Sequence, residues 1–108
     1  MVDESVITSV RTFLRAVQAS GIAVDHGVVF GSQATGLAHG ESDIDLLVVS
    51  PRYDGPRDRA DAQSLWRLAA RTDSRIEPIP CGQRQYDEDD SSMVVELARR
   101  HGVRVDIA

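Results

Sequence analysis

Two short apolar segments, each with small or acidic residues at fixed places, constrain this chain most. The run Val28-Val-Phe ends in Gly31-Ser32, and after ten intervening residues Asp43-Ile-Asp45 opens a second apolar run. In a β-strand residues i and i+2 project from one face, so both aspartates point one way and Ile44 points toward a core. Two carboxylates placed at positions i and i+2 on one face of a strand repel by roughly 2–3 kcal/mol at an effective dielectric near 20. This repulsion indicates a metal cation between them.

The Gly31-Ser32 pair indicates a second ligand. Two small residues at the end of a strand leave room for a phosphate to approach backbone N–H groups and the Ser32 hydroxyl at a helix start. A phosphate site next to metal-binding carboxylates is typical of proteins that act on nucleotides.

The rest of the chain predicts alternating helices and strands. Asp3 and Gly21 bound a first helix, a short helix or turn follows Ser32, and further helices are expected near 57–71 and 91–100. Strands are expected near 26–30, 43–49, 75–79 and 103–107. Pro78 and Pro80 cannot donate ladder hydrogen bonds, so the third strand should lie at a sheet edge. Trp66 should belong to the core or to a partner interface.

Gly-Ser followed after ten residues by Asp-x-Asp, each in a predicted strand, resembles the signature of the DNA polymerase β-type nucleotidyltransferases. It is most similar to the minimal nucleotidyltransferases, which are often paired with HEPN-domain proteins in prokaryotic toxin–antitoxin modules. The resemblance covers most of the chain. It implies an α/β (α+β) fold, a mixed sheet covered by helices, in one domain of residues 1–108.

The resemblance also implies roles for individual residues. Asp43 and Asp45 would be catalytic and would bind Mg²⁺ or Mn²⁺, and Gly31 and Ser32 would contact the phosphates of ATP or another nucleoside triphosphate. Active relatives carry a third carboxylate on a later strand, and Glu77 is the matching position, as a further metal ligand or as general base. Many relatives have an arginine in the loop after Gly-Ser, where this chain has Gln33.

Composition narrows the function classes. The net charge of −5 argues against general nucleic-acid binding. All 12 basic residues are arginines, so no catalytic lysine is available, and the single cysteine, Cys81, excludes an intramolecular disulfide. No apolar run is long enough to span a membrane and no secretory leader is evident, so a cytoplasmic protein without membrane contact is expected.

Two functions are compatible with these residues. The first is an Mg²⁺-dependent enzyme that transfers AMP from ATP to a hydroxyl group. The resemblance implies that this hydroxyl belongs to a HEPN-type partner encoded nearby. The second is a catalytically weak or inactive domain that neutralises such a partner by binding. The sequence leaves open which group accepts the nucleotide and which base the nucleotide carries. It also leaves open the oligomeric state, for which a homo-oligomer is one alternative.

Overall fold

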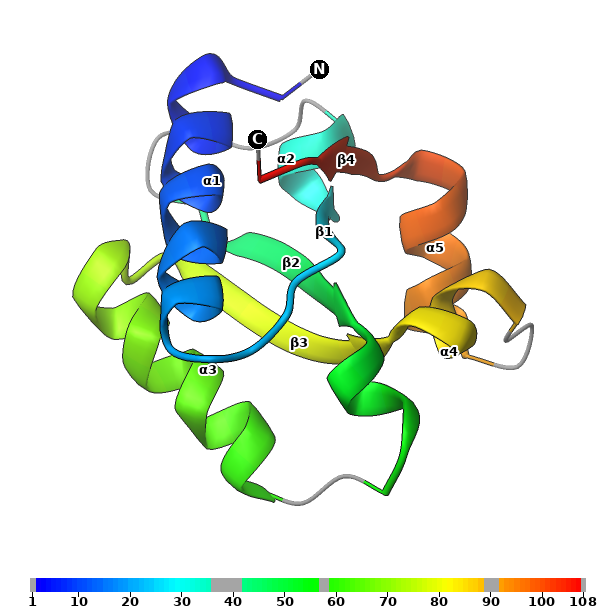
Figure 1. Ribbon diagram of the computed structural model, residues 1–108. Helices are drawn as coiled ribbons and strands as arrows, with labels where there is room; N and C mark the ends of the chain where they lie inside the picture. The colour runs from blue at the N-terminus through cyan, green and yellow to red at the C-terminus, as the bar shows by residue number, and fades with distance from the viewer. Residues whose placement is uncertain (1, 36–41, 57–58, 89–91, 108) are drawn as a thin grey trace.

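The computed structural model describes residues 2–35, 42–56, 59–88 and 92–107. Within these ranges helices and strands alternate along most of the chain, and Figure 1 shows how they are arranged. In chain order the elements are α1 (Glu4–Ala19), β1 (His26–Phe30), α2 (Ser32–Thr35), β2 (Ile44–Ser50), the 3₁₀ helix η1 (Pro51–Asp54), α3 (Arg59–Thr72), β3 (Ile76–Gly82), α4 (Gln83–Glu88), α5 (Met93–His101) and β4 (Val103–Val105).

The described strands form one mixed sheet in the order β3-β2-β1-β4. β1 runs antiparallel to both of its neighbours, β2 and β4, whereas β2 and β3 are parallel and are connected through α3. The expected mixed sheet covered by helices is therefore confirmed.

Helices cover both faces of the sheet. α1 and α3 pack on one face, and α4 and α5 pack on the other (Figure 1). Along β2 the side chains alternate between the two layers, because successive residues of a strand point to opposite faces. Ile44, Leu46 and Val48 join the core beneath α1 and α3, and Leu47 and Val49 join the core beneath α5. Asp45 shares the face of Leu47 and Val49.

β3 lies at an edge of the sheet, as its prolines predict. The Ile44 N–H donates to the Arg75 carbonyl (2.8 Å), so odd-numbered residues of this strand turn their backbone groups toward β2. Pro78 and Pro80 therefore occupy positions whose N–H groups would face away from the sheet. Their missing donors prevent this edge from pairing readily with another strand.

Some expectations were less accurate. The sequence patterns did not predict η1 or α4, β3 continues to Gly82, and the final strand ends at Val105. Trp66 is 47% exposed, so the core alternative for this residue was wrong. The expected helix starts at residues 57 and 91 lie outside the described residues. Within the described part of the chain no helix has the length and apolar character needed to cross a membrane.

Candidate active site

The turn after β1 brings Gly31 against Asp45. Gly31 has a φ of +72°, in the left-handed region that favours glycine, and its carbonyl accepts hydrogen bonds from the N–H groups of Ala34 (3.1 Å) and Thr35 (3.2 Å). A Cβ atom at this position would collide with the Asp45 carboxylate. The sequence therefore needs glycine here for two reasons, the backbone angle and the close approach of an acid.

Asp45 and Glu77 are neighbours across the parallel pair. They are register partners on β2 and β3, and Asp45 is also the register partner of Phe30, the residue before Gly31. Because Ile44 and Ile76 both point into the core beneath α1 and α3, the two acids point together to the opposite face. Their carboxyl groups interact by a hydrogen bond.

The surroundings of Glu77 shift the pKa of its carboxyl group. Partial burial, the hydrogen bond with Asp45, and the negative charges of Asp43 and Asp45 together raise the pKa of Glu77 above its ordinary value, with burial as the largest cause. Glu77 therefore loses its proton less readily than an isolated glutamate. A cation at this place would relieve the same repulsion.

Asp43 and Ser32 lie at the exposed rim of the site. Asp43 is exposed one residue before β2, on the Asp45 side of the chain, and its charge acts on Glu77. Ser32 is exposed at the first position of α2, directly after Gly31. Across the described residues, no three acidic, histidine or cysteine side chains are arranged to hold a metal ion by themselves.

Gln33 supports the backbone of the site, a role that was not predicted from the sequence. Its side chain is buried, with 6% exposed, and its Nε2 donates to the carbonyls of Ser42 (3.1 Å) and Asp43 (3.4 Å). It therefore ties the short helix after Gly31 to the backbone that carries Asp43. Its place directly after Gly-Ser was the only signal available in the sequence.

The turn before β3 fixes the register that aligns Asp45 with Glu77. Asp73 accepts hydrogen bonds from the Arg75 backbone N–H (3.0 Å) and Nε (3.1 Å), and Arg75 Nη2 lies 2.8 Å from its other oxygen. These bonds, with one to Ser9 of α1, hold the pKa of Asp73 at about 2, against the opposing effect of burial. The Arg75 carbonyl in turn accepts from Ile44, the residue between the two aspartates.

Comparisons with known proteins identify the fold and the family of this chain. No curated protein gives a significant match to the chain. A structure of a protein from Sulfolobus solfataricus assigned as a nucleotidyltransferase is similar to it, with 18% identity, a TM-score of 0.63, and coverage of 91% of this chain and 77% of the other. A toxin–antitoxin structure with AMP-PNP is similar at 21% identity and a TM-score of 0.58, covering 87% of this chain and 70% of the other.

At these identities the two structures establish the fold alone. The sequence model of the nucleotidyltransferase domain family matches residues 10–108, nearly the whole chain and all of the residues that form the site. The protein therefore belongs to the nucleotidyltransferase domain family.

Proposed function

We propose that this protein transfers AMP from ATP to a hydroxyl group of a partner protein, in a Mg²⁺-dependent reaction, and that it acts as the antitoxin of a toxin–antitoxin pair. The observation that carries the proposal is the pairing of Asp45 with Glu77 beside the Gly31 turn. The similar toxin–antitoxin structure with AMP-PNP supports the choice of an adenine nucleotide and of a protein partner. A HEPN-domain protein encoded nearby is the proposed partner.

The donor set suits Mg²⁺ or Mn²⁺. Asp43, Asp45 and Glu77 offer hard carboxylate oxygens, and Mg²⁺ in nucleotide enzymes is held by one or two carboxylates together with phosphate oxygens and water. Burial is the largest cause of the raised pKa of Glu77, and the negative charges of Asp43 and Asp45 add to it, so a cation here would be attracted. When bound, the metal would neutralise phosphate charge and make the acceptor hydroxyl easier to deprotonate.

The residues of the chain then have separate tasks. Gly31 and Ser32 leave space for the β- and γ-phosphates, and Asp43 and Asp45 would hold the metal ion that neutralises the triphosphate. The acceptor oxygen bonds to the α-phosphorus, the bond from that phosphorus to the bridging oxygen breaks, and pyrophosphate leaves. Glu77 is placed to receive the hydroxyl proton, and a raised pKa makes a carboxylate a better base.

The test is incubation of the protein with ATP labelled on its α-phosphate, Mg²⁺ and the product of the adjacent gene. We expect mass spectrometry to find an added AMP on a hydroxyl-bearing side chain of that product. Omission of Mg²⁺, or addition of a chelator, should abolish the modification.

A different result would favour the alternative function. If the partner is neutralised with no modified side chain in the presence of wild-type protein, ATP and Mg²⁺, the chain acts by binding alone. Label transferred to a small hydroxyl compound but not to the partner would retain the enzyme and reject the protein acceptor.

A further inference from the structure

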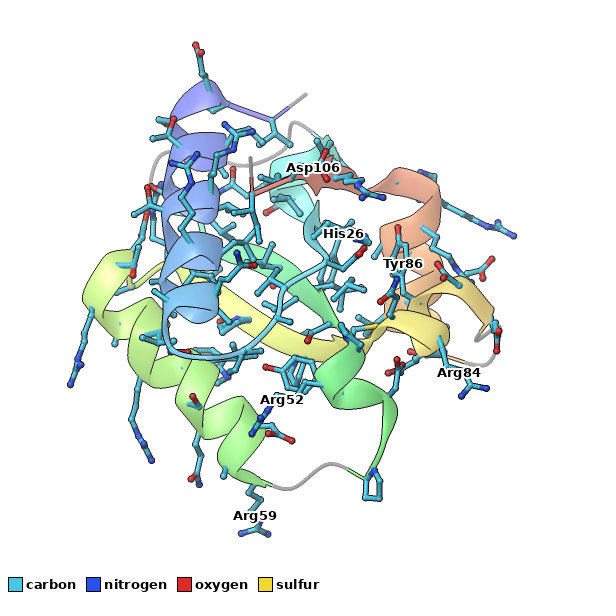
Figure 2. The ribbon with its side chains drawn as sticks, in the orientation of Figure 1. His26, Arg52, Arg59, Arg84, Tyr86 and Asp106 are labelled. Atoms are coloured by element: carbon cyan, nitrogen blue, oxygen red, sulfur yellow. The ribbon has the colours of Figure 1, made fainter. Side chains whose placement is uncertain are left out.

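The solvent face of α3 is basic although the chain as a whole carries a net charge of −5. Arg59, Arg67 and Arg71 are exposed, and none of them forms an ion pair with another described residue. The one acid of this helix, Asp61, is 14% exposed and lies 3.6 Å from Arg52 Nε of η1. Figure 2 shows Arg59 extending away from the molecule at the start of α3. Among the described residues, this face therefore has no exposed carboxylate of α3 to neutralise it.

Trp66 lies at one edge of the exposed face of α3, on the side of Arg59 and about 100° around the helix from Arg67. It is 47% exposed and is flanked by Arg67 in sequence and by the small, exposed Ala70 one turn further along. Tryptophan and arginine are the residues most enriched at the energetic centres of protein interfaces, where lysine and aspartate are depleted. An exposed tryptophan on a helix face that also carries arginines without a described ion pair is typical of a surface that a partner covers.

A small cavity adjoins this face. Arg67 and Arg71, one helical turn apart, line it together with Ser64 and Leu68 of α3 and Ser20 at the end of α1, and its volume is about 230 Å³. The two guanidinium groups and the Ser64 hydroxyl can donate hydrogen bonds into it, whereas the Ser20 hydroxyl donates to the Val17 carbonyl (2.6 Å). A carboxylate side chain is the complementary group, because arginine binds carboxylates with two parallel hydrogen bonds.

We propose that the solvent face of α3 docks an acidic segment of a protein partner, with carboxylates at Arg67 and Arg71 and an apolar side chain against Trp66. The proposal rests on the proposed function only in taking the partner to be a protein. A nucleic acid is the weaker candidate, because a long polyanion would meet the negative charge carried by the rest of the chain. A short acidic segment needs contact with α3 alone, where the charges are complementary.

Trp66 makes the proposal directly measurable, because it is the only tryptophan of the chain. A synthetic peptide of glutamates with one central leucine, titrated into the protein at low salt, should shift the fluorescence of Trp66 in a saturable way. Added salt should weaken this binding, since exposed charges are screened. A deoxythymidine oligonucleotide is titrated in parallel as a polyanion of the other class.

A matched pair of variants separates local contact from overall charge. Arg67→Glu should lower the affinity for the peptide about tenfold, since an attraction becomes a repulsion at the docking face. Arg84→Glu makes the same change in net charge on α4, where Arg84 lies away from α3 (Figure 2), and should change the affinity by less than about twofold. Both positions are exposed on helices, where glutamate is well tolerated.

Three outcomes would overturn the proposal: no response of Trp66 to the peptide, equal loss in both variants, or tighter binding of the oligonucleotide. The last would assign this face to nucleic acid. Because the assay contains neither nucleotide nor metal, its result is independent of the AMP-transfer experiment. Failure of transfer with retained peptide binding would reject the proposed reaction alone.

Discussion

Glu77 lies where burial, Asp45 and Asp43 raise its pKa, which suits a group that accepts a proton from a hydroxyl. Glu77→Gln removes the proton acceptor and keeps the size of the side chain. The transfer rate should fall on the order of 10²–10⁴-fold, the usual contribution of a positioned base. Nucleotide binding should remain, because Asp43 and Asp45 would still hold the metal at the triphosphate. Single-turnover transfer and an ATP titration measure the two effects, and an unchanged rate would exclude Glu77 from the reaction.

Gly31 is the residue whose backbone angle and surroundings both require glycine. Gly31→Ala should lower the free energy of unfolding by about 1–3 kcal/mol, because the new methyl group meets the Asp45 carboxylate and the left-handed φ is strained. Gly55→Ala is the control, since Gly55 has a φ of −91° and its new methyl group would have no atom within 4 Å beyond its own chain neighbours. Urea unfolding of the two variants compares them, and equal stability would show that Asp45 moves aside freely.

Gln33 joins α2 to the chain before β2 through two backbone carbonyls. Gln33→Met keeps the length of the side chain and removes both hydrogen bonds, so unfolding should become easier by about 1–2 kcal/mol. The affinity for Mg²⁺ with ATP should fall as well, because the carbonyl of Asp43 loses its anchor. Gln63→Met on the exposed face of α3 is the control and should leave both quantities unchanged. A stable variant with normal affinity would show that Gln33 does not position Asp43.

At the scale of elements, the predicted part of the fold is the part with a regular apolar pattern. β1 has the predicted bounds, and α1, β2 and the end of α3 differ from prediction by about one residue, because their buried side chains recur at strand or helix spacing. α4 has no buried residue that could give such a pattern. Contacts with residues distant in sequence hold α4 instead. The Arg84 backbone N–H donates to the Asp54 carboxylate (2.9 Å). The Tyr86 ring packs edge-on against the His26 ring, with 5.2 Å between the ring centroids (Figure 2).

Some residues of the candidate site could be predicted from the sequence, and others could not. Gly31, Ser32, Asp43 and Asp45 follow from a local motif, and Glu77 follows from the resemblance. The support given by Gln33 depends on carbonyls nine and ten residues away, and the local turn at Asp73 reaches the site only through the Arg75 carbonyl, which accepts from Ile44. The final strand shows a related effect: the carbonyls of Asp106 and Ile107 accept from Arg11 (3.0 Å) and Arg15 (3.1 Å) of α1, so the chain leaves the sheet after Val105.

The turn from Asp73 to Arg75 sets where β3 begins, so its strength can be read from the pH dependence of stability. The folded pKa of Asp73 is about 2, below the ordinary 3.8, so its contribution is full above about pH 4 and is lost as the pH falls from about 4 toward 2. A shift of that size corresponds to about 2 kcal/mol. Asp73→Asn should therefore lower stability at neutral pH by about 1–2 kcal/mol and flatten this acid limb of the stability curve.

Asp106→Asn is the control for that variant. Asp106 pairs with Arg104 two residues away in the same manner (2.9 Å), but both side chains are largely exposed, where ion pairs contribute little. Urea unfolding between neutral and acid pH compares the two. If both variants lost the same free energy of unfolding, the partial burial of Asp73 would add nothing to the stability of the turn before β3.

At the scale of the whole molecule, the site exists only when the sheet is assembled. Gly31 follows β1, Asp43 and Asp45 lie at the start of β2, and Glu77 reaches them after the chain has passed through α3 to β3. Asp45 and Glu77 therefore become neighbours only in the folded chain, with Asp43 two residues before Asp45. A ligand that bridges them binds the native state alone and must stabilise it by mass action.

Mg²⁺ with ATP should accordingly raise the melting temperature by several degrees at ligand concentrations well above Kd, since about 1 kcal/mol shifts a domain of this size by roughly 4–8 °C. The Asp43→Asn/Asp45→Asn double variant should lose this increase. Without ligand it should be as stable as the wild type or slightly more stable, because the repulsion that acts on Glu77 is removed. ATP with a chelator in place of Mg²⁺ is the control. An unchanged increase in the double variant would place the nucleotide elsewhere on the molecule, away from the acids that the sheet brings together.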